Sequence, residues 1–267
     1  MCHFDKCWVM ILQVKEFMSP NPLVVDPDDQ LEEVLSLMAE KNVWSPVVFR
    51  KYVRGFVTER DLVSNVMAGG LSLKVKVRDV MRPRFGVVRP EDSYVEAARA
   101  MMSVKSRLVV MEGDLLSGVV TASDIVRAYS QSVTESPPVK RFATLRIETV
   151  PHEATVAEVV RLMSRKRVGS LLVKEGDEIV AIVTERDMVR DVLVKGIELS
   201  TPVSEVAKSP LHTMEIGAPL VEVAKLMAEK RIKRVPLTEE GEVVGIITAR
   251  DIVEAIWRMS LYDELAP

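Results

Sequence analysis

Hydrophobic and polar residues follow the same order four times along the chain. A short extended piece near a proline precedes a segment whose apolar residues recur at i, i+3, i+4 and i+7, the spacing of a helix with one buried face. Two short apolar runs around a polar turn come next, and a second amphipathic segment closes the unit. Each unit therefore predicts the order β-α-β-β-α. The first-helix stripes are Leu31, Val34, Leu35 and Met38; Val95, Ala98 and Met102; Val156, Val159, Val160 and Met163; and Leu220, Val223, Ala224 and Met227.

A nine-residue stretch recurs where each second hairpin strand ends. It reads GFVTERDLV from Gly55, GVVTASDIV from Gly118, AIVTERDMV from Ala181 and GIITARDIV from Gly245. The four threonines, at positions 58, 121, 184 and 248, are 63, 63 and 64 residues apart. Because this period exceeds the roughly 20–50 residues of solenoid repeats, it predicts four tandem small domains. Their expected bounds are 14–70, 74–131, 139–196 and 202–260, after a leader at 1–13 that we expect to be disordered.

The segments between repeats predict how the repeats group. Ser130–Lys140 is polar, contains a double proline and lies near the midpoint of the chain. Shorter segments at 68–76 and 195–202 separate the members of each half. The sequence therefore predicts two halves of two repeats each.

The Thr-x-x-Asp element of each stretch has two interpretations. Threonine at the N-cap with an acid three residues later is close to a capping box, and an acid in the first turn suits the helix dipole. The element also lies where a strand ends and a helix begins, a position at which ligands collect. A carboxylate can accept both hydroxyls of a ribose, while a hydroxyl, free amides and arginine can hold phosphate. The two interpretations are compatible.

Four β-α-β-β-α units that each end in this stretch resemble CBS domains over roughly Val14–Met259. The resemblance implies an α/β (α+β) fold in which repeats pair into two modules about pseudo-twofold axes. Four repeats in one chain are similar in layout to the gamma subunit of AMP-activated protein kinase, which implies a disc-like assembly. It also implies clefts for an adenosine ligand: AMP, ADP, ATP or S-adenosylmethionine.

The resemblance assigns roles to residues of this chain. The implied ribose ligands are Asp61, Asp124, Asp187 and Asp251, with Thr58, Thr121, Thr184 and Thr248 at ribose or phosphate. The expected phosphate-facing cations are Arg60, Arg186, Arg250, Lys233, Arg234 and Arg107, and Ser123 weakens this expectation in the second repeat. The expected base pocket comprises Trp44, Ser45, Ser106, Gly169 and Ser170. For Trp44 a plain core position stays open, and for Lys233 and Arg234 a solvated helix end.

Composition limits the remaining possibilities. Apolar residues make up 48% of the chain, charged residues 28%, and the net charge is −3, so a folded core is expected and nucleic acid is not an expected partner. No run approaches the 18 or more apolar residues of a membrane span. Cys2 and Cys7 build no disulfide framework, which fits the cytoplasm, and with His3 they match no strong zinc spacing. Scarce Asn and Gln beside abundant Glu, Lys and Arg favour a thermophilic source.

These observations favour a regulatory protein without catalysis. The sequence shows neither a Ser-His-Asp arrangement nor a Gly-rich phosphate loop, and we expect no required cofactor or metal. A bound nucleotide would shift the angle between paired repeats, and a separate effector protein would read that angle. A homodimer is compatible with this scheme. Two alternatives stay open: a sensor of an S-adenosylmethionine-type ligand with fewer phosphate-facing cations, and a structural interaction module with vestigial sites. Unequal clefts are expected in any case.

Overall fold

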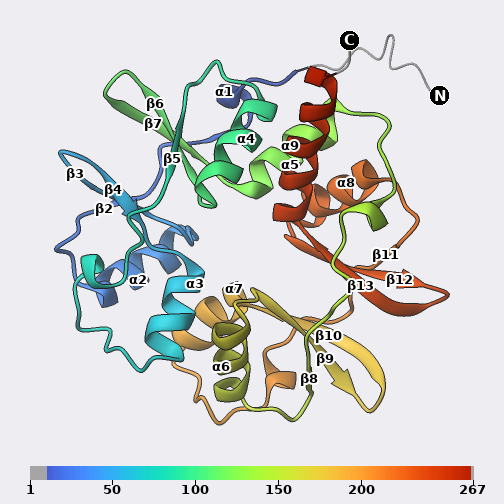
Figure 1. Ribbon diagram of the computed structural model, residues 1–267. Helices are drawn as coiled ribbons and strands as arrows, with labels where there is room; N and C mark the ends of the chain where they lie inside the picture. The colour runs from blue at the N-terminus through green and yellow to red at the C-terminus, as the bar shows by residue number, and fades with distance from the viewer. Residues whose placement is uncertain (1–10, 266–267) are drawn as a thin grey trace. The chain divides into compact units, whose positions relative to one another are not determined.

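The computed structural model describes residues 11–265, and side chains through Leu261. It confirms the order β-α-β-β-α in all four repeats (Figure 1). Repeat 1 has β2 (Val24–Val25), α2 (Leu31–Lys41), β3 (Val47–Arg50), β4 (Tyr52–Phe56) and α3 (Glu59–Asp61), which continues into the π-helix η1 (Leu62–Met67). Repeat 2 has β5 (Gly86–Val88), α4 (Tyr94–Val104), β6 (Leu108–Glu112), β7 (Leu115–Val120) and α5 (Ala122–Ser132). Repeat 3 has β8 (Thr149–Pro151), α6 (Val156–Lys166), β9 (Ser170–Glu175), β10 (Glu178–Thr184) and α7 (Glu185–Asp187), followed by the π-helix η4 (Met188–Leu193). Repeat 4 has β11 (Met214–Glu215), α8 (Leu220–Lys230), β12 (Arg234–Glu239), β13 (Glu242–Thr248) and α9 (Ala249–Leu265).

The strands of each repeat form one small sheet. The first strand pairs in parallel with the middle strand, and the middle and last strands form an antiparallel hairpin. A parallel pair needs a long crossover connection, which the first helix of each repeat supplies. This topology brings the end of the last strand, where the Thr-x-x-Asp stretch begins, beside the start of the middle strand.

The first residues of each repeat pack on its sequence neighbour instead of on their own repeat. In repeat 1, α1 (Val14–Phe17) leads to β1 (Ser19–Pro20), which pairs with β7 of repeat 2. In return, the turn η2 (Val77–Asp79) leads to Arg82, which bridges Phe56 of repeat 1. Repeats 3 and 4 exchange their opening segments in the same way: η3 (Val139–Arg141) leads to a bridge between Thr144 and Ile246, and η5 (Val203–Glu205) leads to a bridge between Lys208 and Ile182. We call these four pieces, residues 14–21, 77–84, 139–146 and 203–211, the exchanged segments.

Each exchanged segment is anchored by a fully buried valine in its helical turn: Val14, Val77, Val139 and Val203. The chain just before it also caps the first helix of the repeat that receives it. The Leu31 amide donates to the Val75 carbonyl, for example, and the Val221 amide donates to Ser136 Oγ at 2.8 Å. Ser136 also hydrogen-bonds Tyr129, whose pKa burial raises to about 12. These connecting segments therefore satisfy helix N-termini that would otherwise lack acceptors.

The repeats assemble into two compact units, each with its own apolar core. The exchanged segments link repeats within each sequence half, as expected for two modules of two repeats, whereas the two apolar cores group alternate repeats. Unit 1 contains the bodies of repeats 2 and 4, residues 85–146 and 212–265, together with residues 11–21. Unit 2 contains the bodies of repeats 1 and 3, residues 22–84 and 147–211. Helix packing explains this grouping, because in unit 1 α5 lies against α8 and α9, and α4 lies against α9 (Figure 1).

Two details of burial differ from expectation. Leu12, which falls in the expected leader, is buried in the core of unit 1, and its carbonyl accepts the Tyr94 amide. In α4 the buried stripe is Tyr94, Ala97, Ala98 and Met101, so the expected positions Val95 and Met102 are only partly buried. Tyr94 explains the shift, because burying its large ring turns the helix by one position relative to the expected stripe.

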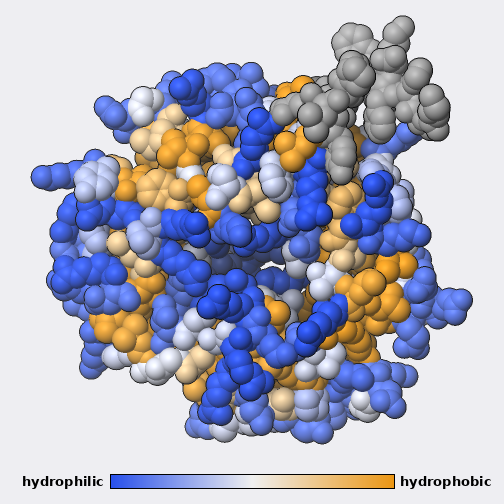
Figure 2. Space-filling view, viewed as in Figure 1, coloured by the Kyte–Doolittle hydropathy of each residue, from blue (hydrophilic) through white to orange (hydrophobic). Residues whose placement is uncertain are grey.

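The surface agrees with the composition. Figure 2 shows a mostly hydrophilic visible face interrupted by separate apolar patches. Among the residues that the structure describes, none of the helices is long and apolar enough to cross a membrane.

The glycine that opens three of the four recurring stretches is explained by the exchanged segments. A Cβ at Gly55 would lie 2.1 Å from the Arg82 carbonyl oxygen, and the residue has φ +153°. A Cβ at Gly245 would meet the Thr144 carbonyl oxygen at 3.0 Å, and one at Gly118 would meet the flexible Met18 sulfur at 2.7 Å. Repeat 3 has Ala181 at this position, buried beside a register irregularity of its hairpin.

Replacing Gly55 with alanine is expected to lower the free energy of unfolding by about 3 kcal/mol, because a backbone carbonyl cannot yield as a side chain can. Gly118→Ala is the matched control, and its cost is expected to be smaller because the closest atom is the flexible end of Met18 and the nearest backbone atom, the Ser19 carbonyl oxygen, lies at 3.0 Å instead of 2.1 Å. Urea unfolding of both variants measures the difference. Equal losses would show that the exchanged segment does not require the glycine.

Candidate functional site

Each Thr-x-x-Asp turn is a capping box in the structure. One oxygen of the aspartate accepts the threonine hydroxyl at 2.6–2.8 Å and the threonine amide at 2.8–3.0 Å. The threonine lies in extended backbone and the helix starts at the next residue. The capping interpretation is therefore confirmed, and the aspartate keeps its second oxygen, Oδ1, for other partners. The four pairs are Thr58 and Asp61, Thr121 and Asp124, Thr184 and Asp187, and Thr248 and Asp251.

In three of the four turns an arginine of the chain contacts this second oxygen. Arg82 pairs with Asp61, Arg127 with Asp124 at 2.8 Å, and Arg190 with Asp187 at 3.5 Å. None of these three arginines is among the site residues expected from the sequence. Arg127 and Arg190 follow the aspartate by three residues, a spacing that places both side chains on one helix face and was a usable signal. Arg82 comes from an exchanged segment, so no local pattern indicated it.

Asp251 differs from the other three aspartates. Within residues 11–261, whose side chains are described, no arginine or lysine forms an ion pair with its carboxylate. Burial raises the pKa of Asp251, against the hydrogen bonds from Thr248 and the nearby charge of Arg250, which lower it. The fourth turn therefore carries a half-buried acid whose second oxygen is not held by a cation of that part of the chain.

The arginines that precede the aspartates differ between the two units. In unit 2, Arg60 Nε donates to Glu185 at 2.8 Å, and Arg186 Nε donates to Glu59 at 3.4 Å. These reciprocal pairs link α3 and α7, which lie side by side in Figure 1. In unit 1 the positions of the two glutamates are taken by Ala122 and Ala249, so the same pairs cannot form. The cations expected to face phosphate in repeats 1 and 3 are thus already engaged by carboxylates.

The hairpin brings the second group of expected residues beside the turn. Arg234 lies opposite Thr248, and the Ala249 amide donates to the Lys233 carbonyl at 2.8 Å. Ser170 lies opposite Thr184, and the Glu185 amide donates to the Gly169 carbonyl at 3.0 Å. Two segments about 14 residues apart in sequence therefore form one locus in repeats 3 and 4.

The corresponding residues of repeats 1 and 2 make contacts of their own. Trp44 is in the core of unit 2 and donates its indole N–H to Asn42 at 2.9 Å, and Ser45 donates to the Trp44 carbonyl. This core position is the alternative that the sequence left open for Trp44. Ser106 and Arg107 directly precede β6, and the Arg107 carbonyl accepts the Gly86 amide. Their roles in a base or phosphate pocket stay predictions.

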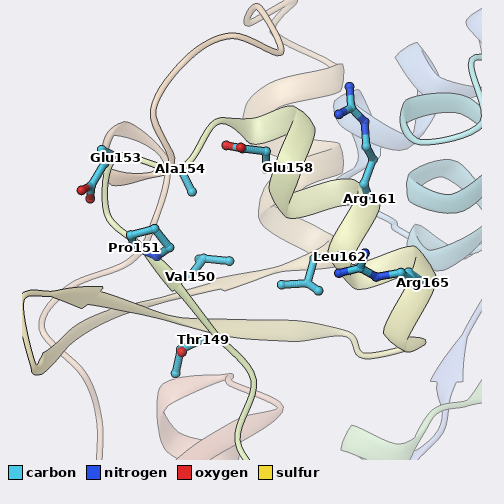
Figure 3. Close-up of a pocket in the computed structure, with 9 residues that line it drawn as sticks. All are labelled: Thr149, Val150, Pro151, Glu153, Ala154, Glu158, Arg161, Leu162 and Arg165. Atoms are coloured by element: carbon cyan, nitrogen blue, oxygen red, sulfur yellow. The ribbon is translucent and has the colours of Figure 1, made fainter.

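No group of three or more His, Cys, Asp or Glu residues that could hold a metal ion occurs among the described residues. Cys2, His3 and Cys7 lie outside that range. A pocket of about 630 Å³ does occur in repeat 3, between β8 and α6 (Figure 3). None of the expected site residues lines it.

All four repeats match one known protein family. The model of the CBS domain matches residues 14–68, 77–131, 139–194 and 203–258. The chain belongs to the CBS domain family. CBS domains are generally regulatory modules that bind small ligands rather than catalysts.

Curated relatives cover much of the CBS repeat array. An uncharacterized 33.4 kDa protein in a ribosomal RNA operon of Thermofilum pendens is 28% identical over 69% of this chain and 66% of its own length. The uncharacterized protein MJ1404 of Methanocaldococcus jannaschii is 25% identical over 91% of this chain and 61% of its own length. The chain thus spans less than two thirds of either relative.

Solved structures support the same fold. Protein MJ1225 from Methanocaldococcus jannaschii, described as a proposed archaeal homologue of g-AMPK, has a TM-score of 0.77 at 19% identity. The similarity covers 91% of this chain and 99% of that one. A conserved protein from Pyrococcus horikoshii has a TM-score of 0.66 at 19% identity, covering 92% and 100%. These similarities establish the fold of the four-repeat CBS array.

The reciprocal ion pairs of unit 2 are open to a direct test. Glu185→Gln is expected to lower the free energy of unfolding by about 1.5 kcal/mol, because it removes a charge-assisted acceptor from Arg60 at a position only 12% exposed. The loss should shrink as salt is raised, since salt screens the pair. Glu178→Gln, an exposed change on β10, is the control and should be neutral. Equal stability of the two variants would contradict a stabilising role for the pair.

Proposed function

We propose that this CBS protein is a non-catalytic sensor of an adenosine nucleotide, AMP, ADP or ATP, and that repeat 4 provides its principal site. The observation that carries the proposal is the state of Asp251, the motif aspartate whose second oxygen is not held by a cation in residues 11–261. A ligand that binds this oxygen displaces no arginine from the Asp251 carboxylate. In its ionised form this carboxylate accepts both ribose hydroxyls.

The surroundings of Asp251 suit the other end of a nucleotide. Arg250 directly precedes the aspartate, and Lys233 and Arg234 lie across the hairpin from Thr248. Three basic residues at one turn make the fourth repeat the most basic of the four at this locus. Guanidinium and ammonium groups there favour a phosphate beside the sugar. The amides at the start of α9 add to the same preference.

The remaining turns are proposed as weaker sites. A ligand at repeat 1 would have to displace Arg82 from Asp61, and one at repeat 2 would have to displace Arg127 from Asp124. In repeats 1 and 3 phosphate would also compete with the glutamates that hold Arg60 and Arg186. This engagement is the observation that favours the alternative ligand: a sulfonium nucleoside such as S-adenosylmethionine requires no phosphate-facing cation.

In the proposed mechanism, ligand binding shifts a population of conformations, and a separate effector protein of the cytoplasm recognises the shifted form. The ligand must bind one conformation better than another for this to happen. No resident cofactor or metal is part of the proposal. The side chains near Asp251 bind the ligand, and the effector protein recognises the resulting conformation.

Asp251→Asn is expected to weaken binding of AMP about tenfold or more, because an uncharged amide loses the charge-assisted bonds to the ribose. Asp124→Asn is the matched control and should leave the tightest site unchanged, since Arg127 already holds that carboxylate. Calorimetric titration with AMP, ADP, ATP and S-adenosylmethionine measures both. Unchanged affinity in Asp251→Asn would exclude the ribose role of this residue. Absence of binding by all four compounds would exclude adenosine sensing.

The affinity of repeat 4 is also expected to depend on pH. Protonation converts the Asp251 carboxylate from an acceptor into a partial donor, so binding should weaken as the pH falls through the pKa of this group. Burial raises that pKa above the ordinary value of 3.8, so the loss should begin at a higher pH than for an exposed carboxyl. Titrations between neutral and acid pH test this. Asp251→Asn should abolish the dependence, and a dependence that survives would assign it to another group.

A further inference from the structure

The pocket of repeat 3 is separate from the Thr-x-x-Asp turn of that repeat. It measures about 630 Å³, within the roughly 300–1,000 Å³ of small-molecule sites. All of its lining residues belong to unit 2, and they come from β8, α6 and the loop between them. They are Thr149, Val150, Pro151, Glu153, Ala154, Glu158, Arg161, Leu162 and Arg165.

The floor of this pocket is apolar. Val150 and Ala154 are 6% and 8% exposed, and Leu162 is partly buried against the core of unit 2. Figure 3 shows Leu162 and Arg165 extending from α6 toward β8, whereas the Arg161 side chain points away from them. An apolar floor beneath a few convergent polar groups is the usual composition of a ligand site.

Among the four first helices, only α6 has an arginine at both of these positions. Arg161 and Arg165 lie one helical turn apart, and within residues 11–261 neither forms an ion pair at hydrogen-bond distance, although the charge of Arg161 helps to lower the pKa of Glu158. The matching positions of the other first helices, counted from the helix start, hold Ser36 and Glu40 in α2, Arg99 and Ser103 in α4, and Lys225 and Glu229 in α8. The fold therefore does not require two cations here, and a planar guanidinium is suited to bind a carboxylate or a similar anion with two bonds.

The opposite end of the pocket is acidic. Glu158 accepts the amide and hydroxyl of Thr155 at the start of α6, and these bonds lower its pKa, so it stays ionised. Glu153, on the loop before α6, is exposed and lies 3.1 Å from His152 Nδ1. The two acids repel a second negative group on a ligand whose first is held by Arg165. We propose that this pocket binds a small monoanionic molecule with an apolar body, of the class of aliphatic or aromatic carboxylates and sulfonates, independently of any nucleotide at the Thr-x-x-Asp turns.

The probe for this proposal is 1-anilinonaphthalene-8-sulfonate, which joins one negative charge to an apolar body. Its fluorescence titration is expected to include a saturable component that Arg165→Gln weakens about tenfold, through loss of a charge-assisted pair. Arg161→Gln should weaken it less, because the Arg161 side chain points away from Leu162 and Arg165. Arg99→Gln, at the position of α4 that matches Arg161, is the control and should leave it unchanged. Uncharged N-phenyl-1-naphthylamine should bind more weakly and respond to none of these substitutions.

Two results would overturn the proposal. One is dye binding that is equal in the natural chain and in Arg165→Gln, with both showing the same thermal unfolding. The other is displacement of the Arg165-dependent dye by ATP, which would make this pocket a polyanion site. AMP titration of Arg165→Gln separates this question from nucleotide sensing, because binding at repeat 4 is expected to be unaffected by a change in repeat 3.

Discussion

The structure depends on one backbone contact that is made four times: the exchanged segment of one repeat pairs with the strand that runs into the Thr-x-x-Asp turn of its neighbour. In repeat 1 the contact consists of two hydrogen bonds between Phe56 and Arg82, at 2.8 and 3.0 Å. The same contact joins Lys208 to Ile182 and Thr144 to Ile246. The contact leaves little room for a side chain at the motif glycines and holds the buried valine of each segment in place. It also brings one side chain from the exchanged segment close to each candidate site.

The side chain that the exchanged segment contributes differs between sites whose own Thr-x-x-Asp sequences are nearly alike. The equivalent positions of the four exchanged segments hold Ser19, Arg82, Thr144 and Lys208. Arg82 pairs with Asp61, whereas Lys208 pairs with Asp191. Burial alone would raise the pKa of Asp191, but hydrogen bonds from its three cationic neighbours lower that pKa below its ordinary value. Ser19 and Thr144 bring no charge. Asp251 is therefore not paired with a cation of residues 11–261 partly because the equivalent position, about a hundred residues earlier in the chain, is Thr144.

Local features were predictable from the sequence, and features that depend on distant segments were not. The strand order, the capping boxes and the proximity of Arg234 to Thr248 follow from periodicity and hairpin geometry over a few tens of residues. The engagement of Arg60 by Glu185 and of Asp61 by Arg82 joins residues 125 and 21 positions apart. The grouping of alternate repeats was also not predictable from the sequence. Every first helix carries a similar apolar stripe, and the stripe does not indicate which other helix it packs against.

The exchange and the alternate grouping together restrict how this chain can be divided. A single excised repeat would lack the segment that completes its sheet. A fragment holding repeats 1 and 2 would recover both exchanged segments, yet α4 and α5 would lose α8 and α9, the helices that cover them in unit 1. Such a half-length fragment would expose the apolar faces around Ile125 and Tyr129. A protein built from only two such repeats would thus have to supply the missing helices from a second polypeptide, so in this architecture gene duplication and subunit association are interchangeable routes to the same core.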